Sequence, residues 1–128
     1  LEPDELLAGL ALPHPPEGMR AGYEKLRIRD AIDFPSLGVA LGLVAEGGKI
    51  VELRAATTAV HTTPDYYGDL GFGGAPLGEE TFRAVAEALG GRSRPVRNLP
   101  LPPAYRKKMV VALTHRLLRR LAGESGVP

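Results

Sequence analysis

Residue types that carry catalysis or bind metals are sparse in this chain of 128 residues. The absence of cysteine excludes a disulfide framework, a thiolate metal site, an iron–sulfur cluster of the chain's own and a cysteine nucleophile. The histidines, His14, His61 and His115, are far apart, with no carboxylate or second histidine at metal-ligand spacing. His115 is interpreted as a solvated or helix-packing residue, and a catalytic role for His61 is not favoured. We therefore predict no catalytic and no metal-binding residue in the chain.

Two further motifs have a structural interpretation in preference to a chemical one. The sequence GFGG at residues 71–74 resembles a phosphate-binding loop, but it lacks the Lys-Ser/Thr that should follow and the strand–helix context. It is therefore predicted to be a flexible loop. Glu79 and Glu80 are expected to favour the start of a helix, because carboxylates in a first turn interact well with the helix dipole.

Basic residues are concentrated in one stretch, although sixteen Lys and Arg against fifteen Asp and Glu leave a net charge of only +1. Residues 92–120 contain no acidic residue and nine basic ones: Arg92, Arg94, Arg97, Arg106, Lys107, Lys108, Arg116, Arg119 and Arg120. Such a stretch could bind nucleic acid, but Tyr105 is the only aromatic residue within it. A solvated helix face, or a surface that meets an acidic partner subunit, is the favoured interpretation.

The elements that would position these residues begin with antiparallel strands. Residues 23–29 alternate with a period of two. Residues 37–44 place Leu and Val on one face and Gly or Ala on the other, where a further backbone layer could approach closely. Gly47 and Gly48 predict a tight hairpin turn, followed by a return strand over residues 50–60.

The second half of the chain is predicted to form loops and two helices. A helix over residues 79–89 is expected to end at Gly90–Gly91. A second helix over residues 103–121 begins with proline and stops at Gly123. Its apolar stripe consists of Val110, Leu113, Leu117 and Leu121. The expected fold class is therefore α+β, with an antiparallel sheet covered on one face by the C-terminal helices.

The N-terminal residues are predicted to be the tail of a preceding domain. Residues 4–7 suggest a turn that leads into a strand over residues 7–12, and three prolines then end regular structure. We therefore divide the chain into a tail (1–13), a linker (14–21) and a compact α+β domain (22–128). No apolar run approaches the ~18 residues of a membrane span, and the lack of cysteine suggests a cytoplasmic protein.

Three segments carry a family resemblance. Residues 23–35 (YEKLRIRDAIDFP) resemble the start of the C-terminal domain of the FAD-binding, or medium, subunit of molybdenum hydroxylases. That family includes carbon monoxide dehydrogenase, xanthine dehydrogenase and 4-hydroxybenzoyl-CoA reductase. Residues 1–7 and 10–13 resemble the end of the subunit's FAD-binding region, and residues 105–108 with the following apolar helix resemble its final helix. The resemblance spans nearly the whole chain and implies the fold of the carbon monoxide dehydrogenase flavoprotein C-terminal domain.

The resemblance also implies a function. In this family a molybdenum centre, iron–sulfur clusters and FAD pass electrons between a substrate and an external partner, and they lie on different subunits or domains. The chain would help to cover the flavin and would dock against a molybdenum-binding large subunit and an iron–sulfur small subunit. Molybdopterin and the [2Fe–2S] clusters would belong to those partners, so the chain alone would carry no complete active site.

Two positions match family residues near FAD. Lys25 matches a lysine near the pyrimidine end of the isoalloxazine ring, where an ammonium favours the negative charge of reduced flavin. Leu7 matches a residue that packs against FAD. Without the resemblance, Lys25 would be interpreted as an exposed strand lysine and Leu7 as a core leucine. Asp33 and Pro35 are interpreted as turn residues.

One segment departs from the family pattern. After the return strand the family has proline-rich sequence and a helix, whereas residues 62–69 read TTPDYYGD and precede a glycine-rich loop. At most a short turn is expected there.

Two alternatives to a flavoprotein fragment stay open: a small basic domain that binds nucleic acid through residues 92–120, and a purely structural docking domain without a ligand.

Overall fold

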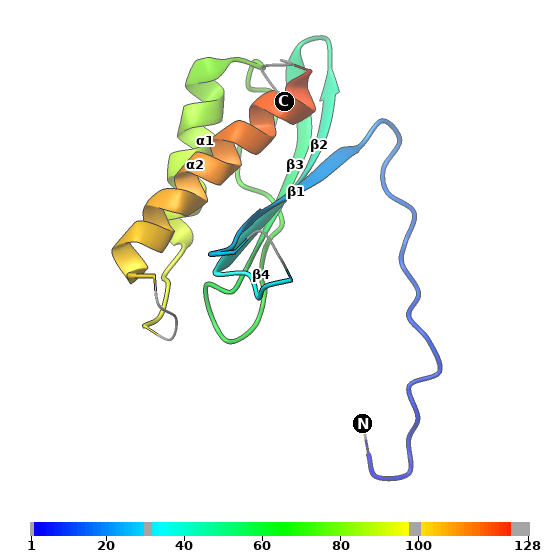
Figure 1. Ribbon diagram of the computed structural model, residues 1–128. Helices are drawn as coiled ribbons and strands as arrows, with labels where there is room; N and C mark the ends of the chain where they lie inside the picture. Colours follow the sequence, from blue (N-terminus) through cyan, green and yellow to red (C-terminus); the bar gives the residue numbers. More distant parts are fainter. Residues whose placement is uncertain (1, 30–31, 98–100, 124–128) are drawn as a thin grey trace.

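A four-stranded antiparallel sheet carries two helices on one of its faces (Figure 1). The computed structural model describes residues 2–29, 32–97 and 101–123. The strands follow chain order across the sheet. The elements are β1 (Arg20–Leu26), β2 (Leu37–Glu46), β3 (Lys49–Thr58), β4 (Asp65–Tyr67), α1 (Glu79–Arg92) and α2 (Pro103–Ala122). The predicted α+β class is confirmed.

The β2–β3 hairpin confirms the turn predicted at two successive glycines. Gly47 and Gly48 have φ values of 56° and 74°, which glycine adopts without the steric cost that a Cβ would add. A type I′ turn requires positive φ at both central positions, and its twist matches that of the flanking strands. The register of the pair shifts between Val44 and Ala45, which marks a bulge near the hairpin end.

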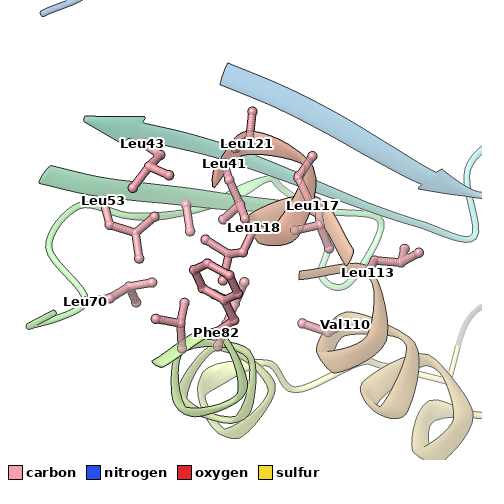
Figure 2. Close-up of a cluster of buried hydrophobic side chains, with 14 of the residues drawn as sticks. Leu41, Leu43, Leu53, Leu70, Phe82, Val110, Leu113, Leu117, Leu118 and Leu121 are labelled. Atoms are coloured by element: carbon pink, nitrogen blue, oxygen red, sulfur yellow. The ribbon is translucent and has the colours of Figure 1, made fainter. Parts of the chain in front are cut away.

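The hydrophobic core fills the space between the sheet and the helices (Figure 2). The inner face of β2 is covered as predicted, since Leu37, Val39, Leu41 and Leu43 are each at most 2% exposed. The stripe of α2 packs against this face, and its members Val110, Leu113, Leu117 and Leu121 are all buried. Phe82 of α1 is fully buried in the same cluster. Both faces predicted from periodicity are therefore confirmed.

The small-residue face of β2 differs from the prediction, because side chains cover it instead of a backbone layer. A Cβ at Gly38 would lie 2.3 Å from Thr58 Oγ1 and 2.4 Å from the hydroxyl of Tyr23. A Cβ at Gly42 would lie 3.1 Å from the sulfur of Met19. Glycine at these positions therefore makes room for neighbouring side chains.

Helix α1 passes through the glycine pair that was predicted to end it. It runs to Arg92 and is followed by Ser93, whose backbone N–H donates to the carbonyl of Leu89 over 3.0 Å. Gly90 is buried against α2, where a Cβ would lie 2.5 Å from Val111 Cγ2. The prediction was wrong because this glycine allows close contact between the two helices and does not end α1.

Of the helices in the described ranges, none has both the length and the apolar character of a membrane span.

The segment between β3 and α1 is more regular than its composition indicated. β4 pairs with β3 where at most a turn was expected, with Ala56 opposite Tyr66. The glycine-rich residues 71–74, predicted to be a flexible loop, contain no helix or strand and are joined to β3 by backbone hydrogen bonds. The N–H of Gly74 donates to the carbonyl of Ile50 over 2.7 Å, and the N–H of Ile50 donates to the carbonyl of Ala75 over 2.9 Å. The loop is thus attached to the outer edge of β3 near the hairpin.

The N-terminal segment contains no strand between its first described residue and β1. A turn is present, but it spans residues 2–5 and not the predicted residues 4–7, with the N–H of Glu5 donating to the carbonyl of Glu2 over 3.0 Å. The strand predicted over residues 7–12 was wrong, because these residues find no pairing partner in the described part of the chain and run clear of the sheet (Figure 1). The division at residues 13 and 21 stays a prediction.

Candidate functional site on the outer face of the sheet

Lys25 projects from β1 on the sheet face opposite the helices. Strand residues alternate between faces. Leu26 and Glu24 therefore point toward α2, where Glu24 pairs with two arginines, and Lys25 points outward and is exposed. Its register partner on β2 is Gly38, which in turn pairs with Thr58 of β3. The ammonium donates to the backbone carbonyl of Asp33 over 3.5 Å, a long hydrogen bond.

The ring of Tyr23 lies over Gly38 and so beside Lys25. The hydroxyl and Cε2 of Tyr23 would lie 2.4 and 2.8 Å from a Cβ at that glycine, so the ring crosses from β1 onto β2. Beneath it, Thr58 Oγ1 is buried and has no hydrogen-bond partner among the described residues. The site thus combines an ammonium, the ring of a tyrosine that is 48% exposed, and a hydroxyl without a hydrogen-bond partner among the described residues.

A second tyrosine continues this face at the far edge of the sheet. Tyr23 pairs with Ala40, Ala40 with Ala56, and Ala56 with Tyr66. The two tyrosines are therefore roughly 14 Å apart, three strand spacings of about 4.8 Å, with small residues between them. Tyr66 is 68% exposed. The sequence gives no direct indication of this row, because it depends on the register of all four strands.

A hydrogen-bonded loop holds the Asp33 carbonyl near Lys25. The backbone N–H of Arg29 donates to Asp33 Oδ2 over 3.1 Å, and Arg29 Nη2 donates to Oδ1 over 3.3 Å. Because both hydrogen bonds favour the ionised carboxylate, they lower the pKa of Asp33 below its usual value. Asp33 acts as a loop residue, in agreement with its interpretation from sequence.

Leu7 is not brought near Lys25. Its residue is 66% exposed on the N-terminal segment, together with Leu6, Leu10 and Leu12, which are exposed by 86–93%. Side chains this apolar and this exposed are available to pack against another domain. The structure leaves the predicted role of Leu7 untested, as it does that of Lys25.

The structure pairs two histidines with carboxylates. His61 Nδ1 lies 2.5 Å from Asp65 Oδ2, and His115 Nε2 lies 2.6 Å from Glu79 Oε1. Asp65 follows His61 by four residues, a spacing that sequence inspection missed. Within the described residues no three His, Asp or Glu groups gather as a metal site. We interpret His61–Asp65 as the contact that ties β4 to the chain leaving β3, and His115–Glu79 as a link between the helices.

The basic stretch does not form one surface. Arg106 is fully buried, and its guanidinium donates to the carbonyl of Ala59 over 2.6 Å and to the carbonyl of Val96. Burial lowers the pKa of this arginine. Arg116 and Arg120 pair with Glu24 at 3.1 and 2.6 Å. The nucleic-acid alternative loses these cations, since a phosphate backbone needs accessible, unpaired charges.

A groove of about 480 Å³ lies beside Tyr66, between β3 and the residues that follow β4. Its lining includes Glu52 and Arg54, which form an ion pair with each other. These two charges therefore compensate each other, and the carboxylate of Asp69, which also lines the groove, accepts a hydrogen bond from the backbone N–H of Gly71. The Lys25 face is better suited to an anionic or strongly polar ring, because among the described residues its ammonium meets only an uncharged carbonyl.

Comparisons with known proteins identify relatives across almost the whole chain. No protein-family model matches it. The carbon monoxide dehydrogenase medium chain of Afipia carboxidovorans is 32% identical over 125 residues, which cover 94% of this chain and 42% of the relative. The xanthine dehydrogenase FAD-binding subunit of Escherichia coli O157:H7 is 25% identical over 129 residues, covering 98% of this chain and 44% of the relative. The chain therefore spans less than half the length of these curated relatives.

Solved structures share the fold. The Cu,Mo-containing carbon monoxide dehydrogenase in its cyanide-inactivated form superposes with a TM-score of 0.76 at 26% identity, covering 89% of this chain and 40% of that one. This chain is homologous to the FAD-binding, or medium, subunits of molybdenum hydroxylases. Carbon monoxide dehydrogenase from Hydrogenophaga pseudoflava, at 22% identity and the same TM-score, supports the fold of this medium-subunit homologue. The resemblance predicted from residues 23–35 is confirmed.

Proposed function

We propose that the chain is the C-terminal domain of the FAD-binding subunit of a molybdenum-containing oxidoreductase, and that the outer face of its sheet covers the flavin. The observation that carries this proposal is the setting of Lys25. Its ammonium is exposed, lies beside an aromatic ring, and is joined to no carboxylate in the described part of the chain. The curated relatives named as FAD-binding subunits align over this whole region.

The residues of this face fit one edge of a flavin. FAD bound in such a subunit would exchange electrons with an external partner. Lys25 would hold the pyrimidine edge of the isoalloxazine, where its positive charge would stabilise the negative charge of the reduced ring. Tyr23 would exclude water beside it, and Thr58 would offer its unsatisfied hydroxyl. Leu7 would add apolar contact from the N-terminal segment.

The charge of Lys25 supplies the main energetic effect. At about 4 Å and an effective dielectric constant near 20, two unit charges attract by up to roughly 4 kcal/mol. This attraction exists only for the reduced, anionic ring, because the oxidised ring is neutral. Lys25 therefore raises the reduction potential.

The test is a redox titration of the complete subunit with Lys25→Met, which removes the charge and keeps much of the side chain's bulk. The two-electron potential should fall, and a loss of 1.4 kcal/mol corresponds to about 30 mV. Lys25→Arg is the matched control, since it retains the charge and should retain most of the potential. Leu7→Ala should weaken FAD binding with less effect on potential, because it removes contact area and no charge.

A Lys25→Met potential equal to that of the wild type, with FAD still bound, would place Lys25 away from the flavin and contradict the assignment. A complete subunit that binds no FAD would contradict the proposed function as a whole. Free and bound FAD are separated by gel filtration before each titration, so the two failures are distinct.

The proposed assembly contains further chains. By analogy with the multi-subunit carbon monoxide dehydrogenases, the subunit would join a molybdenum-binding large subunit and an iron–sulfur small subunit. Residues 1–13 would belong to the preceding FAD-binding domain and residues 14–21 would link it to this one. The chain would then contribute flavin coverage and subunit docking, with the reaction of the substrate occurring elsewhere.

A further inference from the structure

One end of the helix pair carries exposed cations that nothing in the described chain neutralises. Four of the nine cations between residues 92 and 120 are engaged: Arg106 is buried, Arg116 and Arg120 bind Glu24, and Arg119 lies 3.9 Å from Glu79. The five others are Arg92, Arg94, Arg97, Lys107 and Lys108, all exposed. Within the described residues, these five make no ion pair or hydrogen bond through their side chains.

The fold gathers these five residues where α1 ends and α2 begins (Figure 1). A Cβ at Gly90 would lie 3.9 Å from the carbonyl of Lys107, so the last turn of α1 adjoins the first turns of α2. The connection is fastened by Val96, whose carbonyl accepts a hydrogen bond from Arg106. We call the five cations the basic end. Glu87, five positions before Arg92, is the nearest acidic residue along the chain.

We propose that the basic end is the surface through which this domain docks onto an acidic surface of a partner subunit; this inference rests on the proposed function. The basic end belongs to the helix layer, whereas Lys25 lies on the opposite face of the sheet. The flavin side and the docking side can therefore be occupied at the same time. Arg and Tyr are enriched in protein interfaces, and Tyr105, 44% exposed, lies next to the cations in sequence.

An acidic protein fits this surface better than a nucleic acid does. The cations stop after the first turns of α2, because Glu24 neutralises Arg116 and Arg120 further along the helix. Single-stranded nucleic acid is bound by a basic groove with stacking aromatics and a duplex by several phosphate contacts, whereas here the basic track is short. A compact cluster of cations instead steers a complementary acidic patch during encounter and fixes its register.

The experiment compares lysine reactivity in the full-length subunit alone and in the complex formed by co-expression with the proteins encoded beside it. Acetylation read by mass spectrometry should slow by roughly tenfold or more at Lys107 and Lys108 on assembly, because interface cores exclude water. Lys49, at the start of β3, is the internal control and should react equally in both. Zero-length carbodiimide coupling should join Lys107 or Lys108 to Asp or Glu of a partner.

A charge-reversal variant supplies the second measurement. Lys107→Glu with Lys108→Glu should weaken assembly by roughly tenfold or more at low salt. Glutamate and lysine have similar helix propensities, and circular dichroism checks that the helix is retained. The control, Lys49→Glu with Arg83→Glu, changes the net charge equally and should assemble like the wild type.

Several results overturn the inference. One is that Lys107 and Lys108 are acetylated at the same rate in the free and assembled subunit. Another is that assembly slows acetylation of Lys49 as much as that of Lys107 and Lys108. Submicromolar binding of a short DNA duplex that the Lys107→Glu, Lys108→Glu variant abolishes would assign the basic end to nucleic acid. Normal assembly of the Lys107→Glu, Lys108→Glu variant, with FAD bound, contradicts the docking surface alone. Failure of the wild type to bind FAD contradicts the proposed function.

Discussion

Asp33 connects the loop after β1 to the proposed flavin lysine. Two donors of Arg29 bind its carboxylate, at 3.1 and 3.3 Å, and its backbone carbonyl accepts the hydrogen bond from Lys25. Because the hydrogen bonds from Arg29 favour the ionised form, the pKa of Asp33 is lower in the folded chain than in the unfolded chain. The stability of this loop therefore depends on pH.

We predict that Asp33→Asn lowers the free energy of unfolding at neutral pH and that the difference from the wild type disappears in acid. A lowered pKa contributes stability that is complete above the unfolded pKa of about 3.9 and is lost as the pH falls through the folded value. Urea unfolding across this range measures the effect. Asp4→Asn, on the exposed N-terminal segment, is the control and should show no such dependence. A difference for Asp33→Asn that is constant with pH would contradict the coupling.

At the scale of elements, the two helices meet at a glycine. Gly90 and Gly91 are adjacent on α1, but only Gly90 faces α2, where a Cβ would lie 2.5 Å from Val111 Cγ2. At Gly91 a Cβ would meet nothing within 4 Å. Valine has one strongly preferred rotamer in a helix, so Val111 does not turn away without strain. The pair thus separates helix propensity from packing at neighbouring positions.

We predict that Gly90→Ala lowers the free energy of unfolding by about 1–3 kcal/mol, the usual range for overpacking. Gly91→Ala should raise it by about 0.5–1 kcal/mol, because alanine loses less backbone entropy in a helix. Denaturant unfolding of both variants measures the contrast. Adding Val111→Ala to Gly90→Ala should recover part of the loss. Equal stabilisation by both alanines would show that the helices are not in contact at Gly90.

At the scale of the whole molecule, the chain presents two candidate surfaces, one on the sheet and one on the helix layer. Both surfaces are open. Lys25 and the tyrosine row lie on the open face of the sheet, and the basic end lies on the helix layer (Figure 1). Ligand sites commonly bury 70–90% of a small molecule's surface. A single open face provides far less coverage, so flavin binding would require a second domain to close over this one.

We therefore predict that this chain, expressed by itself, purifies without colour. It offers an ammonium and an aromatic ring to FAD on an open face of the sheet. Visible absorbance after gel filtration, followed by release of any flavin in acid, measures the bound fraction. The complete subunit is the positive control. A yellow chain with stoichiometric FAD would show that the outer face alone is sufficient.

Several features follow from the sequence because their signals are local. Gly47 and Gly48 adopt the positive φ values that a tight hairpin needs. Helix α2 begins at Pro103, whose missing N–H costs nothing in a first turn, and ends at Gly123 with φ of 86°. The faces of β2 and α2 follow from periods of two and 3.6 residues. Each signal concerns neighbouring residues, so no knowledge of distant segments is required.

Arg106 illustrates what only the tertiary structure decided. It lies about one helical turn before Val110 on the buried stripe, yet its charge predicted an exposed position. Burial of its guanidinium depends on the carbonyls of Ala59 and Val96, 47 and 10 residues away. The role of Gly90, the Tyr23–Tyr66 row and the separation of the basic end from the cations bound to Glu24 likewise depend on partners far along the chain. Local preference does not determine such contacts, because their energy comes from partners that only the folded chain brings together.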